Sequence, residues 1–339
     1  MSARPATARD PLVSRDRLER LQDLVRDELI RVNTVIIAEM QSPVALIPQL
    51  AQHLVAAGGK RIRPILTLIS ARLCGYRGDR HVNLAACVEF IHTATLLHDD
   101  VVDASDLRRG RATANAIWGN KAPVLVGDFL FSRAFQVMVA DGSLEVLRIL
   151  SEASAVISEG EVMQLLTAND STTTEDAYFA MIEAKTAKLF EAAARIGGVV
   201  AARPAADSDA LADYGRCLGI AFQLIDDALD YGAEQQALGK TVGDDFADGK
   251  VTLPVAIAFA QGDETEKAFW RRVLETDDRR DGDFAEAMRL LRRHDAIGLT
   301  VRRAESYGEQ ARRALDRFAP CPEREAMLEL VDFCIERAY

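Results

Sequence analysis

The stretch from Glu89 to Arg111 constrains the fold most, because it is apolar around most of a helix and yet carries acids at its end. Its apolar side chains are Phe90, Ile91, Ala94, Leu96, Leu97, Val101 and Val102. At helical spacing they occupy almost every side, which predicts a helix buried all round. Asp99 and Asp103 share one helix face, with Asp100 beside them. Because the C-terminal half of a helix repels carboxylates, this buried acid cluster predicts a bound cation.

A second helix repeats this design and ends at Gly232. Its acids are Asp226, Asp227 and Asp230. One DDxxD sequence alone would be read as a solvated acidic turn, since 27% of the residues are charged. Two buried helices with the same acidic end could instead face one another and hold several divalent metal ions. Mg²⁺ prefers carboxylate oxygens and shares its shell with phosphates, so a diphosphate substrate is expected.

Length and pattern favour one all-helical domain. A chain of 339 residues could form two domains, but the helical pattern continues without a linker. We therefore expect a disordered tail over residues 1–13 and a single all-α bundle over residues 14–339. One long helix from Ser14 to Met40 is expected at its start.

Composition excludes several classes of partner. The net charge of −11 disfavours nucleic acid and electrostatic docking on an anionic membrane. Five scattered cysteines without a CxxC pair indicate reduced thiols in a cytoplasmic protein and no zinc site. The first residues lack an apolar region and carry early acids, so no secretory signal is expected. No run of eighteen uncharged apolar residues occurs, so no membrane span is expected, only transient membrane contact for product release.

Two basic groups could bind anions. GGKRIRP places Lys60, Arg61 and Arg63 at a helix start preceded by glycine, where free N–H groups add to their charge. Such a cluster alone is more often a solvated surface. LRRG places Arg108 and Arg109 just after the first acids, where guanidinium groups can hold phosphate oxygens in pairs.

Together the two DDxxD sequences, GGKRIRP, LRRG and GKTVGDD resemble those of the trans-polyprenyl diphosphate synthases, which are prenyltransferases of the all-helical isoprenoid synthase family. The resemblance covers nearly the whole chain from Gly58. It implies a helical bundle with a central cavity and three Mg²⁺ ions, for which Mn²⁺ can substitute. It also implies head-to-tail condensation of isopentenyl diphosphate with an allylic prenyl diphosphate, release of diphosphate, and a homodimer.

The resemblance assigns roles to single residues. The metal ligands would be Asp99, Asp103, Asp226 and Asp230, with Asp100 and Asp227 helping directly or through water. The ligands of isopentenyl diphosphate would be Lys60, Arg63, His92 and Arg109. The ligands of the allylic diphosphate would be Arg108 and Lys185. Thr186 and Gln223 would offer oxygen dipoles to the carbocation, and Lys240 would close a mobile lid, with Lys250 a weaker candidate.

Some of these residues also have ordinary interpretations. Glu89 and His92 form an ExxH sequence of the di-iron type, but no second ExxH exists. A lysine in mid-helix, such as Lys185, normally extends its amine to water. Thr173 and Asp176 predict the start of the helix that carries it.

Product length is expected to depend on the residues one turn before Asp99. Ala94 and Thr95 are small, whereas resembling short-chain synthases have an aromatic residue there that closes the tunnel. The tunnel can continue past Ile91 and Val88, which predicts an octaprenyl to decaprenyl product suited to a quinone side chain. A deeper floor could come from the next helix, or its candidates could be ordinary core residues: Phe129, Phe131, Phe135 or Met138. A shorter farnesyl or geranylgeranyl product is the alternative.

Two other functions use the same fold. A terpene cyclase needs only one diphosphate site, and its second metal motif carries Ser or Thr and Glu where this chain has only aspartate. A non-catalytic partner subunit typically loses acids from one motif, and here both are intact. The paired basic groups therefore favour a synthase over either alternative.

Overall fold

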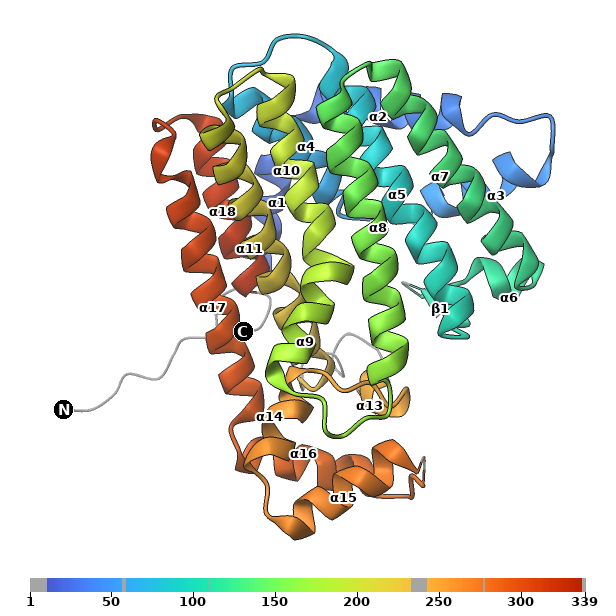
Figure 1. The fold of residues 1–339 in the computed structure, drawn as a ribbon, viewed down its shortest axis with the longest axis vertical. Helices are drawn as coiled ribbons and strands as arrows, with labels where there is room; N and C mark the ends of the chain where they lie inside the picture. The colour runs from blue at the N-terminus through green and yellow to red at the C-terminus, as the bar shows by residue number, and fades with distance from the viewer. Residues whose placement is uncertain (1–10, 57–58, 109, 233–242, 277, 337–339) are drawn as a thin grey trace. The chain divides into compact units, whose positions relative to one another are not determined.

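The structure, a computed structural model, describes residues 11–56, 59–108, 110–232, 243–276 and 278–336, which are almost entirely helical (Figure 1). The predicted all-α class is confirmed. The chain divides into two compact units. Unit 1 comprises residues 1–21, 156–188 and 216–339, and unit 2 comprises residues 22–155 and 189–215. The boundaries of the expected tail and of a single domain remain predictions.

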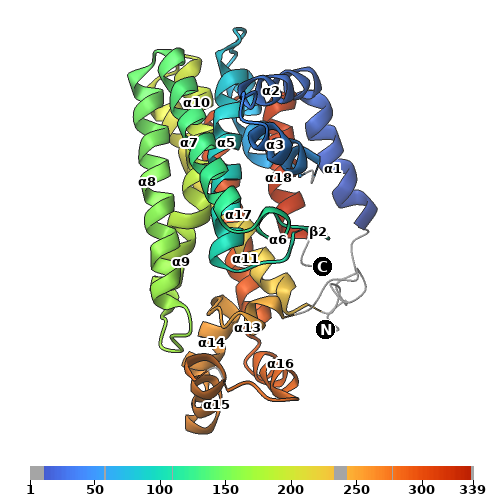
Figure 2. The ribbon, with the colours of Figure 1, turned by 90° about the vertical axis from the view of Figure 1, so that its right-hand side faces the viewer.

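Unit 2 is built around α5 (Arg80–Val102), which packs against α7 (Lys121–Asp141) along its length (Figures 1 and 2). The other elements that lie mainly in this unit are α2 (Arg26–Glu39), α3 (Leu46–Ala56), α4 (Ile62–Leu73), β1 (Leu107–Arg108), β2 (Arg111–Ala112), α6 (Ala114–Trp118) and α10 (Lys188–Val200). Helices α2 and α4 also contact α5. Buried residues occur on all sides of α5, so the burial predicted from its apolar pattern is confirmed.

Unit 1 has its core around α14 (Leu253–Gln261) and α17 (Ala296–Ala314), which contact each other. Its further elements are α1 (Pro11–Leu24), α9 (Glu175–Ile182), a π-helical turn (Glu183–Ala187), α13 (Asp244–Ala247), α15 (Glu264–Glu275), α16 (Asp283–Arg293), a 3₁₀ turn (Leu315–Arg317) and α18 (Pro322–Glu336). Two long helices, α8 (Leu144–Thr167) and α11 (Ala205–Asp230), supply residues to both units. Trp270 is fully buried in the core of unit 1.

The expected single N-terminal helix is wrong, because the chain breaks at Val25 between α1 and α2. Val25 has φ −119° and is fully buried. The two helices have different partners: Arg17 of α1 pairs with Glu336 of α18 at 2.7 Å, whereas α2 packs against α4 and α5. The apolar spacing continues through the break and therefore did not reveal it.

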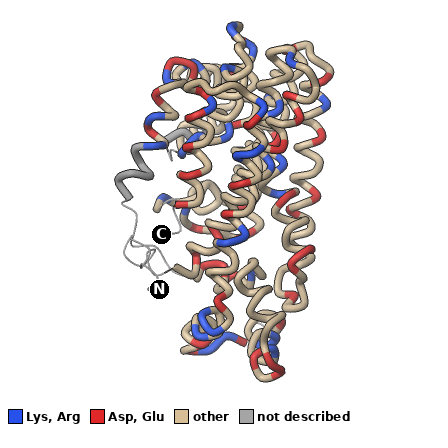
Figure 3. The backbone as a smooth tube through the Cα atoms, turned by 90° about the vertical axis from the view of Figure 1, so that its left-hand side faces the viewer, with Lys and Arg blue, Asp and Glu red and all other residues tan. Residues whose placement is uncertain are grey.

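Within the described residues, only α7 is long and apolar enough to cross a bilayer, judged by length and a mean hydropathy of 1.3. A buried core helix meets the same criterion, and α7 packs on α5. Acidic and basic residues are interspersed along many of the helices (Figure 3). On α8, for example, Arg148 pairs with both Glu145 and Glu152.

Candidate active site

The first acidic group lies where α5 ends. The helix stops at Val102, and the N–H of Asp103 donates to the carbonyl of Asp99 at 2.8 Å. The side chains of Asp99 and Asp103 are half-buried, whereas Asp100 is only 3% exposed. Burial raises the pKa of Asp100 and the nearby guanidinium of Arg108 opposes this rise. The predicted placement of the acids at the C-terminal end of a buried helix is confirmed.

Arg108 is held by a short hairpin formed by β1 and β2. Leu107 pairs with Ala112, and Arg108 pairs with Arg111. Gly110 has φ +72°, a conformation that favours glycine in a tight hairpin turn. From this hairpin the Nε atom of Arg108 donates to Asp100 at 2.7 Å. Arg109 lies outside the described residues, so its expected role remains a prediction.

A basic group forms where α4 packs against α5. Arg63 Nη1 lies 3.1 Å from His92 Nε2, and the guanidinium lies 4.5 Å from the ring centre of Phe190. Because an arginine can only donate, His92 Nε2 must accept and carries no proton. Lys60 is exposed just before α4, and its carbonyl accepts from Gln22. The structure thus brings together Arg63 and His92, two of the residues assigned to isopentenyl diphosphate.

Arg61 differs from Lys60 and Arg63 in its backbone conformation and in its partner. It adopts a left-handed backbone with φ +52° and forms an ion pair with the buried Glu89. A non-glycine residue in this conformation is strained and persists only where its surroundings fix it. Glu89 and His92 therefore contact different arginines, which explains the ExxH sequence without a di-iron site.

The expected chain-length residues lie on α5, one turn before Asp99. At 100° per residue, the side chain of Ala94 leaves the helix axis within about 40° of the directions of Cys87 and His98, so the three share one face. Those two residues contact α7 through the carbonyls of Ala134 and Val124. Ala94 is fully buried, as are Ile91, Val88 and Leu84, and Thr95 is half-buried. The positions along which the tunnel was expected to continue are therefore filled by packed side chains.

The second acidic group lies where α11 ends, at Asp230. Asp227 is 3% exposed, and both its oxygens accept hydrogen bonds: Oδ1 from Gln223 Nε2 at 2.8 Å, and Oδ2 from the hydroxyl of Tyr178. Burial raises the pKa of Asp227 to about 7, against the effect of these two donors. Burial also raises the pKa of Asp230 to about 6. Asp226 is half-buried on the same helix.

Lys185 and Thr186 lie in the π-helical turn Glu183–Ala187, which interrupts the long helix expected here. The helix begins at Glu175 with Thr174 as its cap, one residue later than Thr173 predicted. Gly160 of α8 permits the close approach of this turn. A Cβ atom at Gly160 would lie only 2.6 Å from the backbone nitrogen of Lys185. Lys185 Nζ lies 2.5 Å from Glu161, and Thr186 donates to Gln223 Oε1 at 2.9 Å. Single π turns of this kind are common at functional sites.

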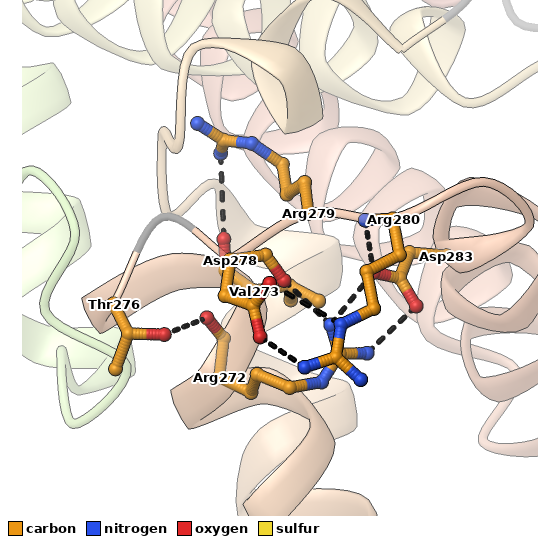
Figure 4. A network of polar contacts seen from close by, with 7 residues as sticks. All are labelled: Arg272, Val273, Thr276, Asp278, Arg279, Arg280 and Asp283. Carbon is orange, nitrogen blue, oxygen red and sulfur yellow. Dashed lines mark hydrogen bonds and ion pairs between the residues drawn. The ribbon is translucent and has the colours of Figure 1, made fainter.

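Several polar side chains form a network in the turn between α15 and α16 (Figure 4). Arg272 forms two hydrogen bonds with Asp283, at 2.6 and 2.8 Å. In the same turn, Arg279 donates to the carbonyl of Phe246 in α13 at 3.1 Å. The N–H of Asp245 in α13 then donates to Asp230 Oδ2 at 3.1 Å. The network thus fixes the short helix that contacts the last acid of α11.

Comparison with known proteins identifies the family. The polyprenyl synthetase family matches residues 44–291. The chain belongs to the polyprenyl synthetase family. It is 47% identical over 322 residues to the octaprenyl diphosphate synthase of Escherichia coli, covering 94% of this chain and 99% of that protein. The resemblance drawn from the sequence motifs is therefore confirmed.

Solved structures of the family agree with this fold. A decaprenyl diphosphate synthase from Rhodobacter capsulatus has a TM-score of 0.91 and 49% identity, with 95% of this chain and 99% of that chain covered. A polyprenyl synthase from Caulobacter crescentus, solved with calcium and isoprenyl diphosphate, has a TM-score of 0.90 and 49% identity, with coverages of 95% and 98%.

The acids of this chain supply part of a site for a hard divalent cation. Within the described ranges, no three His, Cys, Asp or Glu side chains converge into a complete metal site. Asp99 with Asp103, and Asp226 with Asp230, are nevertheless the oxygen donors that Mg²⁺ takes when water and phosphate complete its shell. The raised pKa of Asp230 reflects burial and the charges of neighbouring acids, which a cation would offset.

Some residues near the acids were not predicted from the sequence, and two predicted ones cannot be placed. Tyr178, Glu161 and Arg279 contact site residues or their supports, but their sequence surroundings do not distinguish them from ordinary helix residues. A buried carboxylate needs donors, and this requirement is the signal that could have prompted a search for Tyr178. Lys240, like Arg109, lies outside the described residues. Lys250 pairs with Asp248 at 3.0 Å.

Proposed function

We propose that this protein condenses isopentenyl diphosphate head-to-tail with an allylic prenyl diphosphate, releases diphosphate, and makes an all-trans octaprenyl to decaprenyl diphosphate. The observation that carries the proposal is the repeated acidic helix end, on α5 and on α11, accompanied by separate basic residues. The identity of 47% to an octaprenyl diphosphate synthase favours a long product over a short one.

In the proposed reaction, Mg²⁺ would supply, when bound, the positive charge that offsets the charge of the leaving diphosphate. Asp99 and Asp103 at the end of α5, and Asp226 and Asp230 at the end of α11, would hold Mg²⁺. Lys185 would exchange its partner Glu161 for a diphosphate oxygen. Arg63 and His92 bind isopentenyl diphosphate.

The allylic C–O bond breaks with both electrons on the diphosphate, which leaves an allylic carbocation. The oxygens of Thr186 and Gln223 stabilise its positive charge. The double bond of isopentenyl diphosphate attacks the cation, and the released diphosphate takes the proton that is lost.

Product analysis tests this function. The purified protein is incubated with Mg²⁺, radiolabelled isopentenyl diphosphate and one allylic primer at a time, and the products are separated by chain length. We expect a linear long-chain product that disappears with a metal chelator. Cyclic hydrocarbon from the allylic primer alone would indicate a terpene cyclase, and no product from any primer would indicate a non-catalytic subunit.

We further propose that the protein acts as a homodimer in the cytoplasm. The side of α7 away from the core exposes Leu125, Phe135 and Val139, whose side chains are 66%, 43% and 66% exposed. Such an apolar face on one helix is typical of an interface between copies. We expect light scattering to give the mass of two chains for the wild type and one for Val139→Arg. A wild-type monomer, or activity only with a second gene product, would contradict this.

A further inference from the structure

Four side chains of unit 1 form a continuous chain of hydrogen bonds. The hydroxyl of Tyr178 in α9 donates to Asp227 Oδ2, and Gln223 Nε2 donates to Asp227 Oδ1 at 2.8 Å. Thr186, in the π-helical turn, donates to Gln223 Oε1 at 2.9 Å. The chain therefore runs from a buried phenol to the two residues assigned to the carbocation.

The chemistry of the groups fixes the direction of each bond. Both oxygens of Asp227 accept, one from Tyr178 and the other from Gln223 Nε2, so the amide nitrogen of Gln223 faces Asp227. The amide oxygen then points the other way, toward Thr186, and the hydroxyl proton of Thr186 is used in donating to it. Both oxygens consequently present lone pairs, and not protons, to their surroundings. A dipole in this direction stabilises positive charge.

Tyr178 is well placed to hold this arrangement. It is 1% exposed, and Asp227 is 3% exposed, so neither can exchange its partner for bulk water. Removing the phenol would leave Asp227 Oδ2 buried without its donor, at a cost that favours rotation of the carboxylate. Since Gln223 takes its orientation from that carboxylate, the loss would be passed on to Gln223 and Thr186.

We propose, on the basis of the function above, that Tyr178 is a positioning residue that acts through Asp227 to keep the oxygens of Gln223 and Thr186 directed at the carbocation. Asp227 is then the central link of this chain and not a metal ligand, although it belongs to the second DDxxD sequence. This replaces the expectation that Asp227 assists metal binding directly or through water.

The decisive variant is Asp227→Asn. Its amide oxygen can still accept from Tyr178, but its amide nitrogen donates, so Gln223 must turn and present N–H groups toward Thr186. We expect kcat to fall about 10²- to 10³-fold, as when an electrostatic donor or acceptor of a transition state is lost. Tyr178→Phe removes one hydrogen bond to the buried carboxyl group of Asp227 and should lower kcat about tenfold. KM for the allylic primer should change about twofold or less in both.

Controls separate positioning from general damage. Tyr231 is as buried as Tyr178 and lies in the same unit. The described donors to Asp227 are Tyr178 and Gln223, so Tyr231→Phe should retain wild-type kcat. In the double variant Tyr178→Phe with Gln223→Leu, the loss should be about that of Gln223→Leu alone, because the phenol acts through the amide. If Tyr178 had only a structural role, the kcat loss of the double variant would be the product of the losses of the two single variants. The kcat values of the variants would then also fall in step with their thermal stability.

Metal binding gives a readout independent of turnover. Calorimetric titration of Mg²⁺ in the presence of an unreactive allylic thiolodiphosphate should give the same affinity for wild type and Asp227→Asn. A tenfold or greater weakening would make Asp227 a metal ligand and overturn the inference. A wild type without product would refute the proposed function itself, whereas an active wild type with an unimpaired Tyr178→Phe would refute only this inference.

Discussion

At the end of α5 the middle aspartate, Asp100, accepts from the guanidinium of Arg108, whereas at the end of α11 the middle aspartate, Asp227, is held by a phenol and an amide. Both residues are 3% exposed. One therefore has a full positive charge beside it, and the other has only neutral donors. Burial raises the pKa of both, and that of Asp227 reaches about 7.

The difference comes from the segment that succeeds each helix in the sequence. After α5 the chain turns into a hairpin that returns an arginine to the acids. After α11 it leads to α13, which brings further acids, and the pKa of Asp245 is raised by burial and by the charges of Asp227 and Asp230. The same DDxxD pattern thus has two electrostatic environments. The acids at the end of α11 have less positive charge beside them, so a bound cation would stabilise them more.

The first acid of each motif should matter equally, despite this difference. We expect Asp99→Ala and Asp226→Ala each to lower kcat by about 10²- to 10³-fold, because each removes an oxygen ligand of the proposed metal. Circular dichroism should show an intact fold. Asp213→Ala, an exposed acid earlier on α11, serves as the control. Near-normal turnover in either folded variant would refute the model of two metal-binding helix ends.

Replacing basic residues of the two units should raise KM for different substrates. Lys60→Ala and Arg63→Ala, in unit 2, should raise KM for isopentenyl diphosphate about 10- to 10²-fold. This is the change in binding expected when one charge-assisted hydrogen bond is lost. Lys185→Ala, in unit 1, should do the same for the allylic primer. Exposed Lys121 provides the control. If Lys60→Ala weakened only the allylic primer, the assignment of the GGKRIRP residues would be wrong.

The two helices also differ one turn before their acids. On α5 these positions hold Ala94 and Thr95, whereas α11 has Ala221 and Phe222. Replacement of Ala94 by Phe should shorten the product to about three or four isoprene units, and overpacking against α7 should cost about 1–3 kcal/mol of stability. Phe222→Ala should leave chain length unchanged. A wild type that stops at farnesyl or geranylgeranyl diphosphate would refute the proposed role of Ala94.

The sequence was sufficient to predict both acidic helix ends, because their apolar periodicity and acid spacing are local properties. It did not reveal the break at Val25 or the π turn at Lys185, since each leaves the apolar spacing almost unchanged. Nor did it reveal the bond from Tyr178 to Asp227, which joins residues 49 apart. Such partners depend on the packing of distant helices, which no local pattern specifies.

The last expected effect is a pH dependence of stability that distinguishes the two middle acids. Without divalent cations, the raised pKa values of Asp227 and Asp230 mean that the folded state binds more protons than the unfolded state between about pH 4 and about pH 7. Stability should therefore decrease as pH rises through this range, by on the order of a few kcal/mol in total.

Thermal unfolding in chelator from pH 5 to pH 8 measures this slope. Asp227→Asn should flatten it clearly, because the asparagine does not titrate, whereas Asp100→Asn should flatten it little, because Arg108 already offsets the charge of Asp100. Added Mg²⁺ should flatten the slope of the wild type by stabilising the ionised acids near it. If Asp100→Asn had the larger effect, the charge difference between the ends of α5 and α11 would be the reverse of that inferred from their partners.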